Sequence, residues 1–462
     1  MRKKNLRFLA AFFMGKLARR VLKILGKRAT TFPGRLATKM CPDFLGMINK
    51  PETIVAVTGT NGKTTVCNLL VDILNDNGYS VLDNRTGSNL SSGVASSLLA
   101  GSKLNGKAKN KIAIFEIDER YGRFIYPYVI PNYLVCTNLF RDSIKRNAHA
   151  EFIADIVTNS IPKESKLILN GDDLISSNLA PENERVYFSI DRLETDLEEG
   201  INIINDIRIC PKCNSMLEYD YVRHHHIGHA HCPNCEFASP ESDYMAKLNL
   251  AERTMIIEEK EESIEYGLIS DSIFNINNQV TAIAVLRELG LEGEKIRKSL
   301  ENLKIIETRY SHEVVEGIEV ITHMAKERNP IACSCVFDYL NQLSGTKEII
   351  LLLDDIFDKK ESSENITWYY DADFEFLNSE NIIRLIIGGV RAKDYRLRLL
   401  IAGVPDEKIV CVEEETDTPN YLELENTDKV IVLHEVYAIA EAMKIKNKAI
   451  EVINRRKQKD EN

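Results

Sequence analysis

The sequence predicts an α/β protein in which two sheets of mainly parallel strands follow one another along the chain. Short apolar runs rich in β-branched residues alternate with stretches of helical periodicity, which is typical of parallel strands joined by helices. A more mixed region separates two clusters of runs, so we expect two α/β domains with a boundary near residues 304–310. The predicted strands are 53–57, 112–115, 133–136 and 167–169, then 348–353, 382–387, 409–412 and 430–433.

Length and composition favour several folded domains. With 462 residues, 44% of them hydrophobic and 28% charged, the chain can bury more than one core. We predict a basic leader over 1–50, a first α/β domain over 51–305 and a second over 306–462. A four-cysteine segment at 206–240 interrupts the first domain as an insertion.

Charge is distributed unevenly along the chain. The net charge of −10 argues against nucleic-acid binding, which favours an excess of Lys and Arg. The first 42 residues nevertheless contain no Asp or Glu. A secretory signal is one reading of this leader, but Lys16, Arg19 and Arg20 interrupt its apolar stretch too early. No run reaches the roughly 20 apolar residues of a membrane-spanning helix. The leader either packs on the fold or makes a peripheral contact with an anionic membrane.

A glycine-rich turn follows the first predicted strand and precedes a predicted helix. Gly59 and Gly62 let the backbone direct N–H groups at a phosphate, and Lys63 supplies a mobile cation. Thr64 or Thr65 offers a hydroxyl to Mg²⁺. Val57 stands where the strict phosphate-loop pattern has its first glycine, so this is a shorter variant. We expect contacts to ATP phosphates from Thr58, Gly59, Thr60, Asn61, Gly62, Lys63, Thr64 and Thr65.

The insertion carries four cysteines in two Cys-Pro-x-Cys pairs with eighteen residues between the pairs. This spacing is typical of a structural Zn²⁺ site with four thiolates, which leaves no open position for catalysis. A redox disulfide is the alternative for such pairs. Five histidines between the pairs are expected to be surface or packing residues. The predicted zinc ligands are Cys210, Cys213, Cys232 and Cys235. The other six cysteines lie mainly in apolar contexts, so we expect a reducing, cytoplasmic location.

Carboxylates follow the second predicted strand in Glu116-Ile-Asp-Glu119, and Thr137-Asn-Leu-Phe-Arg-Asp142 closes the next. Parallel sheets place their ligands at this edge. The alternative is that these side chains are only solvated at strand ends.

The string Thr-Gly-Thr-Asn-Gly-Lys-Thr-Thr resembles the Mur ligases and folylpolyglutamate synthases, which form amides through an acyl phosphate. The resemblance implies a central P-loop ATPase domain with an inserted four-cysteine zinc ribbon, followed by a Rossmann-like C-terminal domain. It further implies that Glu116 is a Mg²⁺ ligand together with Thr64, and that Asn275 and Asn278 meet the adenine.

The ribbon and the second α/β domain make the chain similar to the MurT family, the synthetase subunits of lipid II isoglutaminyl synthases. The strings 137–142, 368–375 and 388–392 carry this resemblance. It implies amidation of the D-glutamate α-carboxylate of lipid II with ammonia from a GatD-like glutaminase partner, since no cysteine here lies in a Gly-x-Cys-x-Gly elbow. Lys63 and Glu116 would then be catalytic, Asp355 would orient ammonia, and Arg309 would contribute a cation to the nucleotide site. The location implied is the cytoplasm, at the inner membrane face.

Two other functions remain open from the sequence. One is a self-sufficient amino acid ligase, although only about 50 residues precede the phosphate loop, too few for the UDP-binding domain of nucleotide-sugar ligases. The other is a zinc-ribbon interaction scaffold with a vestigial ATP site, against which the Lys63-Thr64 pair and Glu116 argue.

Overall fold

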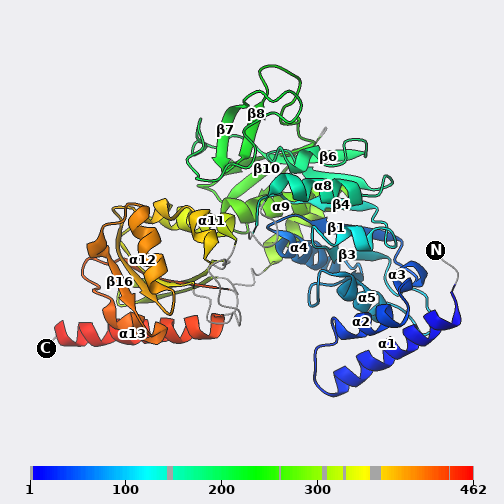
Figure 1. Cartoon of the computed structure of the whole chain (residues 1–462), viewed down its shortest axis with the longest axis horizontal. Coiled ribbons are helices and arrows are strands. Elements are labelled where there is room, and N and C mark those ends of the chain that lie inside the picture. Colours follow the sequence, from blue (N-terminus) through cyan, green and yellow to red (C-terminus); the bar gives the residue numbers. More distant parts are fainter. Residues whose placement is uncertain are drawn as a thin grey trace. The chain divides into compact units, whose positions relative to one another are not determined.

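A computed structural model describes residues 4–142, 149–259, 262–303, 310–325, 329–353, 366–435 and 438–460. The described residues divide into two compact units. Unit 1 comprises those within Met1–Phe140, His149–Ile201 and Asn205–Lys304, and unit 2 comprises the remainder. Each unit is built on its own sheet (Figure 1).

The helices and strands of unit 1 follow in chain order. They are α1 (Leu6–Ile24), α2 (Phe32–Met40), α3 (Phe44–Met47), β1 (Thr53–Thr58), α4 (Lys63–Asp76), β2 (Val81–Asp83), α5 (Ser91–Ala100), β3 (Ile112–Glu116), α6 (Gly122–Ile125), β4 (Tyr133–Cys136), α8 (Ala150–Ser160), β5 (Lys166–Asn170), η1 (Ser176–Asn178), β6 (Arg185–Ile190), β7 (Glu218–His224), β8 (Ile227–His231), β9 (Tyr244–Asn249), β10 (Thr254–Glu259), β11 (Glu262–Gly267), α9 (Ile273–Glu288) and α10 (Gly293–Asn302).

The main sheet of unit 1 has nine strands in the order β11-β10-β9-β6-β5-β4-β1-β3-β2. Pairing is parallel from β2 to β9, and β10 and β11 add an antiparallel edge. Apolar side chains alternate along the central strands, so each face packs against helices. One core joins the sheet to α4, α9 and α10, and the other joins it to α1, α2, α3, α5, α6 and α8.

The path of the chain around β1 creates a topological switch point at the carboxyl ends of the strands. From β1 the chain enters α4 on one face, whereas from the neighbouring β3 and β4 it enters α6 and α8 on the opposite face. Open α/β sheets bind ligands where helices diverge to opposite faces in this way. The glycine-rich turn after β1 lies at this point.

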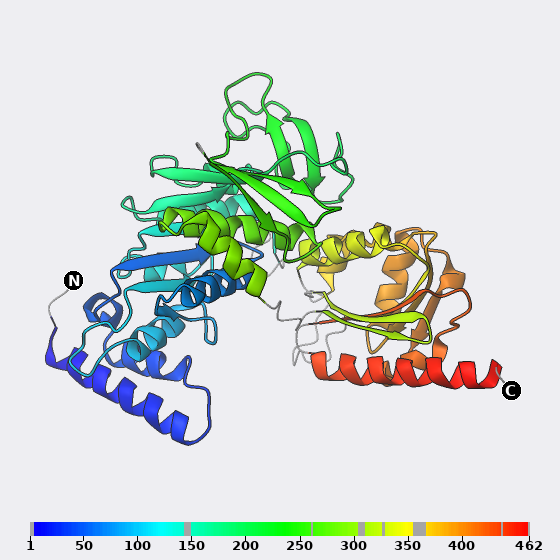
Figure 2. The same ribbon diagram turned by 180° about the vertical axis from the view of Figure 1, so that it is seen from behind.

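The N-terminal residues form helices that pack on the outside of unit 1. In Figures 1 and 2, α1 lies against α2 and α5 at the outer edge of the unit. The α2 and α5 backbones approach closely, because a Cβ built on Gly34 would lie 2.1 Å from the carbonyl oxygen of Ser92. One of the two predictions for the basic leader was a helix packed on the fold, and α1 is such a helix.

The ribbon hairpin is a separate two-stranded antiparallel sheet of β7 and β8. A small cluster of buried residues supports it, including Leu174 and Phe237 beside Cys210 and Cys232. The hairpin turn contains His225, whose φ of +53° places it in the left-handed region.

Unit 2 has a six-stranded sheet in the order β12-β13-β17-β14-β15-β16, parallel except for β12. Its helices α11 and α12 cover one face and α13 covers the other. The elements are β12 (Tyr310–Val315), β13 (Ile318–Met324), α11 (Pro330–Gln342), β14 (Lys347–Leu352), η3 (Thr367–Tyr370), η4 (Phe374–Leu377), β15 (Ile382–Gly388), α12 (Ala392–Ile401), η5 (Asp406–Lys408), β16 (Ile409–Val412), η6 (Glu415–Tyr421), β17 (Lys429–His434) and α13 (Ile439–Asp460).

All eight strands predicted from apolar runs are present, as β1, β3, β4, β5, β14, β15, β16 and β17. Apart from the parallel strand β6, which lies between β5 and β9, the strands that the apolar pattern did not reveal lie at an edge or have an antiparallel neighbour. β10 and β11, for example, alternate apolar residues with glutamates because one face of this part of the sheet is exposed. In the part of the chain that the structure describes, no helix has the length and apolar character needed to cross a membrane.

Gly34 gives a test of the packing of the N-terminal helices. We expect Gly34→Ala to lower the midpoint of thermal unfolding, because the new methyl group forces α2 and α5 apart at a cost of about 1–3 kcal/mol. The matched control is Gly267→Ala, since a Cβ at Gly267 would meet nothing within 4 Å. Equal midpoints for the two variants would show that the close approach of α2 and α5 is unimportant.

Candidate functional site

The loop between β1 and α4 has the conformation expected of a phosphate loop. Gly59 and Gly62 have φ values of +123° and +86°, which residues with side chains rarely adopt. Space is also restricted. A Cβ on Gly59 would lie 2.2 Å from Oγ1 of Thr137, and a Cβ on Gly62 would lie 2.0 Å from Oδ1 of Asn278. The turn therefore requires glycine at both positions, and it places the first turn of α4 at the carboxyl end of β1.

Lys63 begins α4 and lies within this loop. Its ammonium group donates to the carbonyl oxygens of Gly59 and Thr60, and it lies 3.4 Å from Oε1 of Glu119. Glu119 is 3% exposed, and its second carboxylate oxygen has no hydrogen-bond partner among the described residues. The buried carboxylate of Glu119 thus helps to hold the Lys63 ammonium group over the loop. From the sequence, Glu119 was expected only as one of several acidic residues after β3.

Thr64 and Glu116 form a second pair at the same edge. Oγ1 of Thr64 donates to Oε2 of Glu116 over 2.8 Å, and Nδ2 of Asn89 contacts Oε1 of Glu116 at 3.3 Å. Asn84 holds the backbone of Glu116 by two hydrogen bonds of 2.8 Å. Glu116 is half-buried and so remains accessible to an ion.

The Thr64–Glu116 pair fits a magnesium ion. In an octahedral shell with bonds of about 2.1 Å, neighbouring oxygens lie about 3 Å apart, close to the 2.8 Å between these two atoms. Magnesium bound to nucleotide needs only one or two protein ligands of this kind. Thr65 is also half-buried at the start of α4, but no contact to Glu116 is described for it.

The end of β4 fixes the loop from the other side. The N–H of Asn61 donates to Oδ1 of Asn138 over 3.0 Å, and Oγ1 of Thr137 donates to the carbonyl oxygen of Asn61 over 2.6 Å. Thr60 and Phe140 are linked by a hydrogen bond of 2.9 Å from the Phe140 N–H to Oγ1 of Thr60. These residues are buried or half-buried, so the loop is tied to β4 as well as to β3.

The tip of the ribbon hairpin packs against the segment that follows β4. The ring of Phe140 packs 4.6 Å from the ring of His226, centroid to centroid. Nε2 of His226 lies 3.2 Å from Oδ1 of Asp173, whose other oxygen accepts the Leu139 N–H over 2.7 Å. Burial acts to raise the pKa of Asp173, but hydrogen bonds from His226 and from backbone N–H groups lower it overall. A continuous set of contacts therefore connects the ribbon to the phosphate loop.

A buried ion-pair cluster anchors the hairpin close to its tip. Arg223 donates to Asp172 over 2.8 Å and to Asp196 over 2.9 Å. The pKa of Arg223 is raised because the two carboxylates outweigh the opposing effect of burial. Removing one member of such a cluster leaves an unpaired buried charge, so the hairpin is held firmly against unit 1.

The histidines between the cysteine pairs divide into two groups. His225 and His226 are each 1% exposed, whereas the side chains of His229 and His231 are near half exposure. The ring of His224 packs 4.4 Å from the ring of Phe274, and burial lowers the pKa of His224 well below the ordinary value, so it is neutral. They are surface and packing residues as expected, but the sequence carried no signal for the contact between His226 and Asp173.

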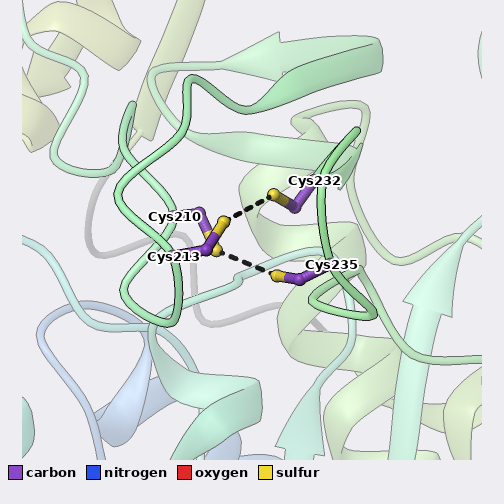
Figure 3. Close-up of side chains that lie close together, drawn as sticks. All are labelled: Cys210, Cys213, Cys232 and Cys235. Carbon is purple, nitrogen blue, oxygen red and sulfur yellow. Dashed lines mark hydrogen bonds between the residues drawn. The ribbon is translucent and has the colours of Figure 1, made fainter.

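The four cysteines of the insertion converge as the spacing predicts (Figure 3). Their sulfur atoms all lie within 4.8 Å of one another. The Cys210–Cys235 and Cys213–Cys232 sulfur distances are 3.5 and 3.3 Å. These exceed the roughly 2.05 Å of a disulfide and approach the roughly 3.8 Å between thiolates around zinc. All ten cysteines of the chain are free thiols. The cluster therefore fits tetrahedral zinc better than a redox disulfide.

The two asparagines of α9 that were expected to contact adenine differ in burial. Asn278 is buried with its amide against Gly62, whereas Asn275 is half-buried and donates to Oγ of Ser270 over 3.2 Å. The structure thus brings Asn278 to the phosphate loop, together with Lys63, Thr64 and Glu116. Arg309 and Asp355 lie outside the described residues.

Two family models match the chain. The Mur ligase middle domain matches residues 57–207, and the MurT ligase C-terminal domain matches residues 327–439. Both matches cover segments that carry the motifs described above, the first including the phosphate loop and Glu116.

Among curated proteins, the chain is similar to the lipid II isoglutaminyl synthase (glutamine-hydrolyzing) subunit MurT of two organisms. Identity to the Staphylococcus aureus (strain COL) protein is 31% over 408 residues, covering 88% of this chain and 90% of that protein. Identity to the Streptococcus pneumoniae (strain ATCC BAA-255 / R6) protein is 29%, covering 88% and 89%.

Solved structures share the fold at lower identity. A pseudomurein peptide ligase type C from Methanothermus fervidus matches with a TM-score of 0.64 and 19% identity, covering 91% of this chain and 83% of that one. The MurF ligase of Thermotoga maritima in complex with ADP matches with a TM-score of 0.57 and 14% identity, covering 96% and 84%. The expected Mur ligase fold is confirmed.

Zinc binding can be tested by substitution at the cysteine cluster. We expect Cys232→Ser to lower bound zinc from about one ion per chain toward none and to lower the thermal unfolding midpoint, because three thiolates hold the metal less firmly. Metal content is measured by mass spectrometry. Cys411→Ser, at an exposed free cysteine, is the control and should retain zinc. Full zinc content in Cys232→Ser would exclude the four-thiolate site.

His226 gives a test of the link between ribbon and phosphate loop. We expect His226→Ala to weaken ATP binding about five- to tenfold, because Asp173 loses a buried hydrogen bond and Phe140 loses its packing partner. His226→Asn, which restores a donor, should recover part of the affinity. The control is His229→Ala, since the described hydrogen bond of His229 is to the exposed side chain of Asp220, at 2.7 Å. ATP affinity is measured by titration with a fluorescence readout. Equal affinities of the two alanine variants for ATP would contradict the link.

Proposed function

The chain belongs to the MurT family and is an ATP-dependent ligase, and from this premise we propose that it amidates lipid II in peptidoglycan synthesis. The reaction proposed converts the α-carboxylate of D-glutamate in the stem peptide into the amide of D-isoglutamine. The similarity to two MurT subunits over most of their length supports this substrate. The arrangement of Lys63, Thr64 and Glu116 at the sheet edge carries the proposal chemically.

Activation of the carboxylate is proposed to begin with phosphate binding by the glycine-rich loop. Backbone N–H groups of the loop and the N-terminus of α4 would bind the phosphates of ATP. The ammonium of Lys63 now lies on loop carbonyls, and its flexible stem would let it turn to the transferring phosphate and neutralise its charge. Transfer of the γ-phosphoryl group to the substrate carboxylate would give an acyl phosphate and ADP.

Thr64 and Glu116 are the residues that would hold Mg²⁺. The ion would supply positive charge that offsets the negative charge developing on the phosphates. Asn89 and Asn84 would keep Glu116 oriented through the contacts described above. Asn278, against Gly62, is proposed to line the nucleotide, with Asn275 one turn away in α9. Roles for Arg309 with the nucleotide and for Asp355 with ammonia remain proposals from the family resemblance.

Ammonia is proposed to come from a partner glutaminase of the GatD type. Glutamine hydrolysis by such enzymes needs a reactive thiolate. In this chain, burial raises the pKa values of the Cys67, Cys136 and Cys335 thiols well above the ordinary value. These cysteines suit a protein core rather than a nucleophile, which supports a separate source of ammonia. Attack of ammonia on the acyl phosphate would then release phosphate and form the amide.

The proposed place of action is the cytoplasmic face of the cell membrane, because lipid II is anchored there by its lipid. Zinc is proposed to have a structural role only. Four thiolates complete its tetrahedral shell, so no position remains for substrate. The three proposed metal and nucleotide cofactors are therefore ATP and Mg²⁺ at the sheet edge and Zn²⁺ in the ribbon.

Amidation by the co-purified pair tests the proposal. With lipid II, glutamine and ATP, we expect mass spectrometry to show replacement of a hydroxyl by an amino group on the stem peptide. Lys63→Ala should lower the rate at least about 100-fold, because the transferring phosphate loses its cation. The control Lys298→Ala removes a solvent-exposed lysine of α10 and should keep full activity. Amidation without nucleotide, or undiminished in Lys63→Ala, would falsify the proposal.

A further inference from the structure

The outer face of α1 exposes a row of large apolar side chains. Leu6, Leu9, Phe13, Leu17, Val21 and Ile24 are all exposed, with Leu6 at 84% and Ile24 at 77%. Their spacing of three and four residues places them within an arc of about 120° on the helix. Phe8, Ala11, Phe12 and Gly15, which pack on unit 1, lie on the opposite side. The row is thus a second apolar face that the fold of unit 1 leaves uncovered.

Cations border this row. A groove of about 530 Å³ is lined by Lys16, Arg19, Arg20 and Lys23 of α1, with Leu17, Ile24 and the exposed Leu104 among them. Leu104 belongs to the segment after α5, which adds the exposed side chains of Lys103, Lys107 and Lys109. We call these apolar and basic residues together the α1 face.

Positive charge is concentrated in the two chain segments that form the α1 face. Residues 1–42 contain no Asp or Glu, and neither do residues 84–115, while the whole chain has a net charge of −10. Lys16 is one of these cations and is half-buried. Burial, followed by the charges of Lys109 and Arg19, lowers its pKa to about 8. An anionic surface would relieve this repulsion.

We propose that the α1 face docks unit 1 on the surface of an anionic phospholipid bilayer, with α1 parallel to the membrane. An apolar row flanked by Lys and Arg is the pattern of helices that lie in the interface, where apolar side chains enter the acyl boundary and cations meet headgroups. The helix is not long and apolar enough to cross. Nucleic acid would leave the apolar row in water, and phosphate alone would leave it uncovered.

The docking surface deepens the membrane location proposed above, because it would hold the phosphate-loop unit beside a lipid-anchored substrate. It does not depend on amidation. Docking requires neither ATP nor lipid II, so it can be measured with vesicles that lack both.

Sedimentation with vesicles tests the proposal on the full-length protein. Vesicles of phosphatidylglycerol and phosphatidylcholine should bind the protein, and vesicles of phosphatidylcholine alone should bind it much less. Arg20→Gln with Lys23→Gln should weaken binding about fivefold per charge removed. Phe13→Gln with Leu17→Gln should weaken it at least about tenfold. The matched control is Leu250→Gln with Lys298→Gln, which removes an apolar and a basic side chain exposed elsewhere on unit 1.

Insertion can be followed independently by fluorescence. Leu17→Trp adds a reporter to a chain whose one other tryptophan, Trp368, is buried in unit 2. We expect the emission of the introduced tryptophan to shift to the blue with anionic vesicles and to be quenched by brominated lipid. Equal binding to neutral vesicles, an equal loss in the control variant, or no change in the emission of the Leu17→Trp variant would overturn the proposal. The proposal would also be overturned if the α1 variants kept vesicle binding but lost self-association or glutaminase binding. The α1 face would then bind a protein partner.

Discussion

The site depends on a turn that has no room for side chains. Gly59 and Gly62 combine positive φ values with neighbours that occupy the space of a Cβ, Thr137 in one case and Asn278 in the other. Because both neighbours lie on other elements of unit 1, the turn cannot relax by itself. Its N–H groups and the start of α4 are therefore oriented before any ligand arrives, and the positions of Lys63 and Thr64 follow from this.

The charged groups of the site are arranged by strand order. Adjacent parallel strands end at one edge, so Glu116 of β3 and the residues after β4 reach the loop after β1 from either side. Thr64 and Glu116 form a pair accessible to a cation, and Lys63 with Glu119 forms a second, more buried pair. A low local dielectric strengthens both pairs, which suits groups that must meet phosphate charge. Thr64 and Lys63, which are adjacent in the chain, thus contact different carboxylates.

The ribbon has a structural connection to this site in addition to its own fold. Its cysteines lie at one end of the hairpin, and His226 lies at the other, against Asp173 and Phe140. The Arg223 cluster fixes the hairpin between these points. A zinc ion held by the cysteines would in this way influence the geometry of the phosphate loop, because rigid packed elements transmit small displacements. The α1 face lies on the other side of the unit, on the layer of helices that includes α2 and α5.

Residues adjacent in the chain determined much of what the sequence alone could predict. The eight apolar strands, the glycine-rich turn with Lys63 and Thr64, and the paired cysteines are local patterns, since periodicity, positive φ and ligand spacing act over a few residues. Glu116 was singled out because it ends a recognisable strand and because the family resemblance implies a Mg²⁺ ligand there. The polar edge strands were missed because a half-exposed strand lacks an apolar run, and the roles of Glu119, Asp173 and His226 were missed because their partners lie 34 to 56 residues away. Only the tertiary structure decided these contacts, since burial and strand order, not sequence spacing, bring such side chains together.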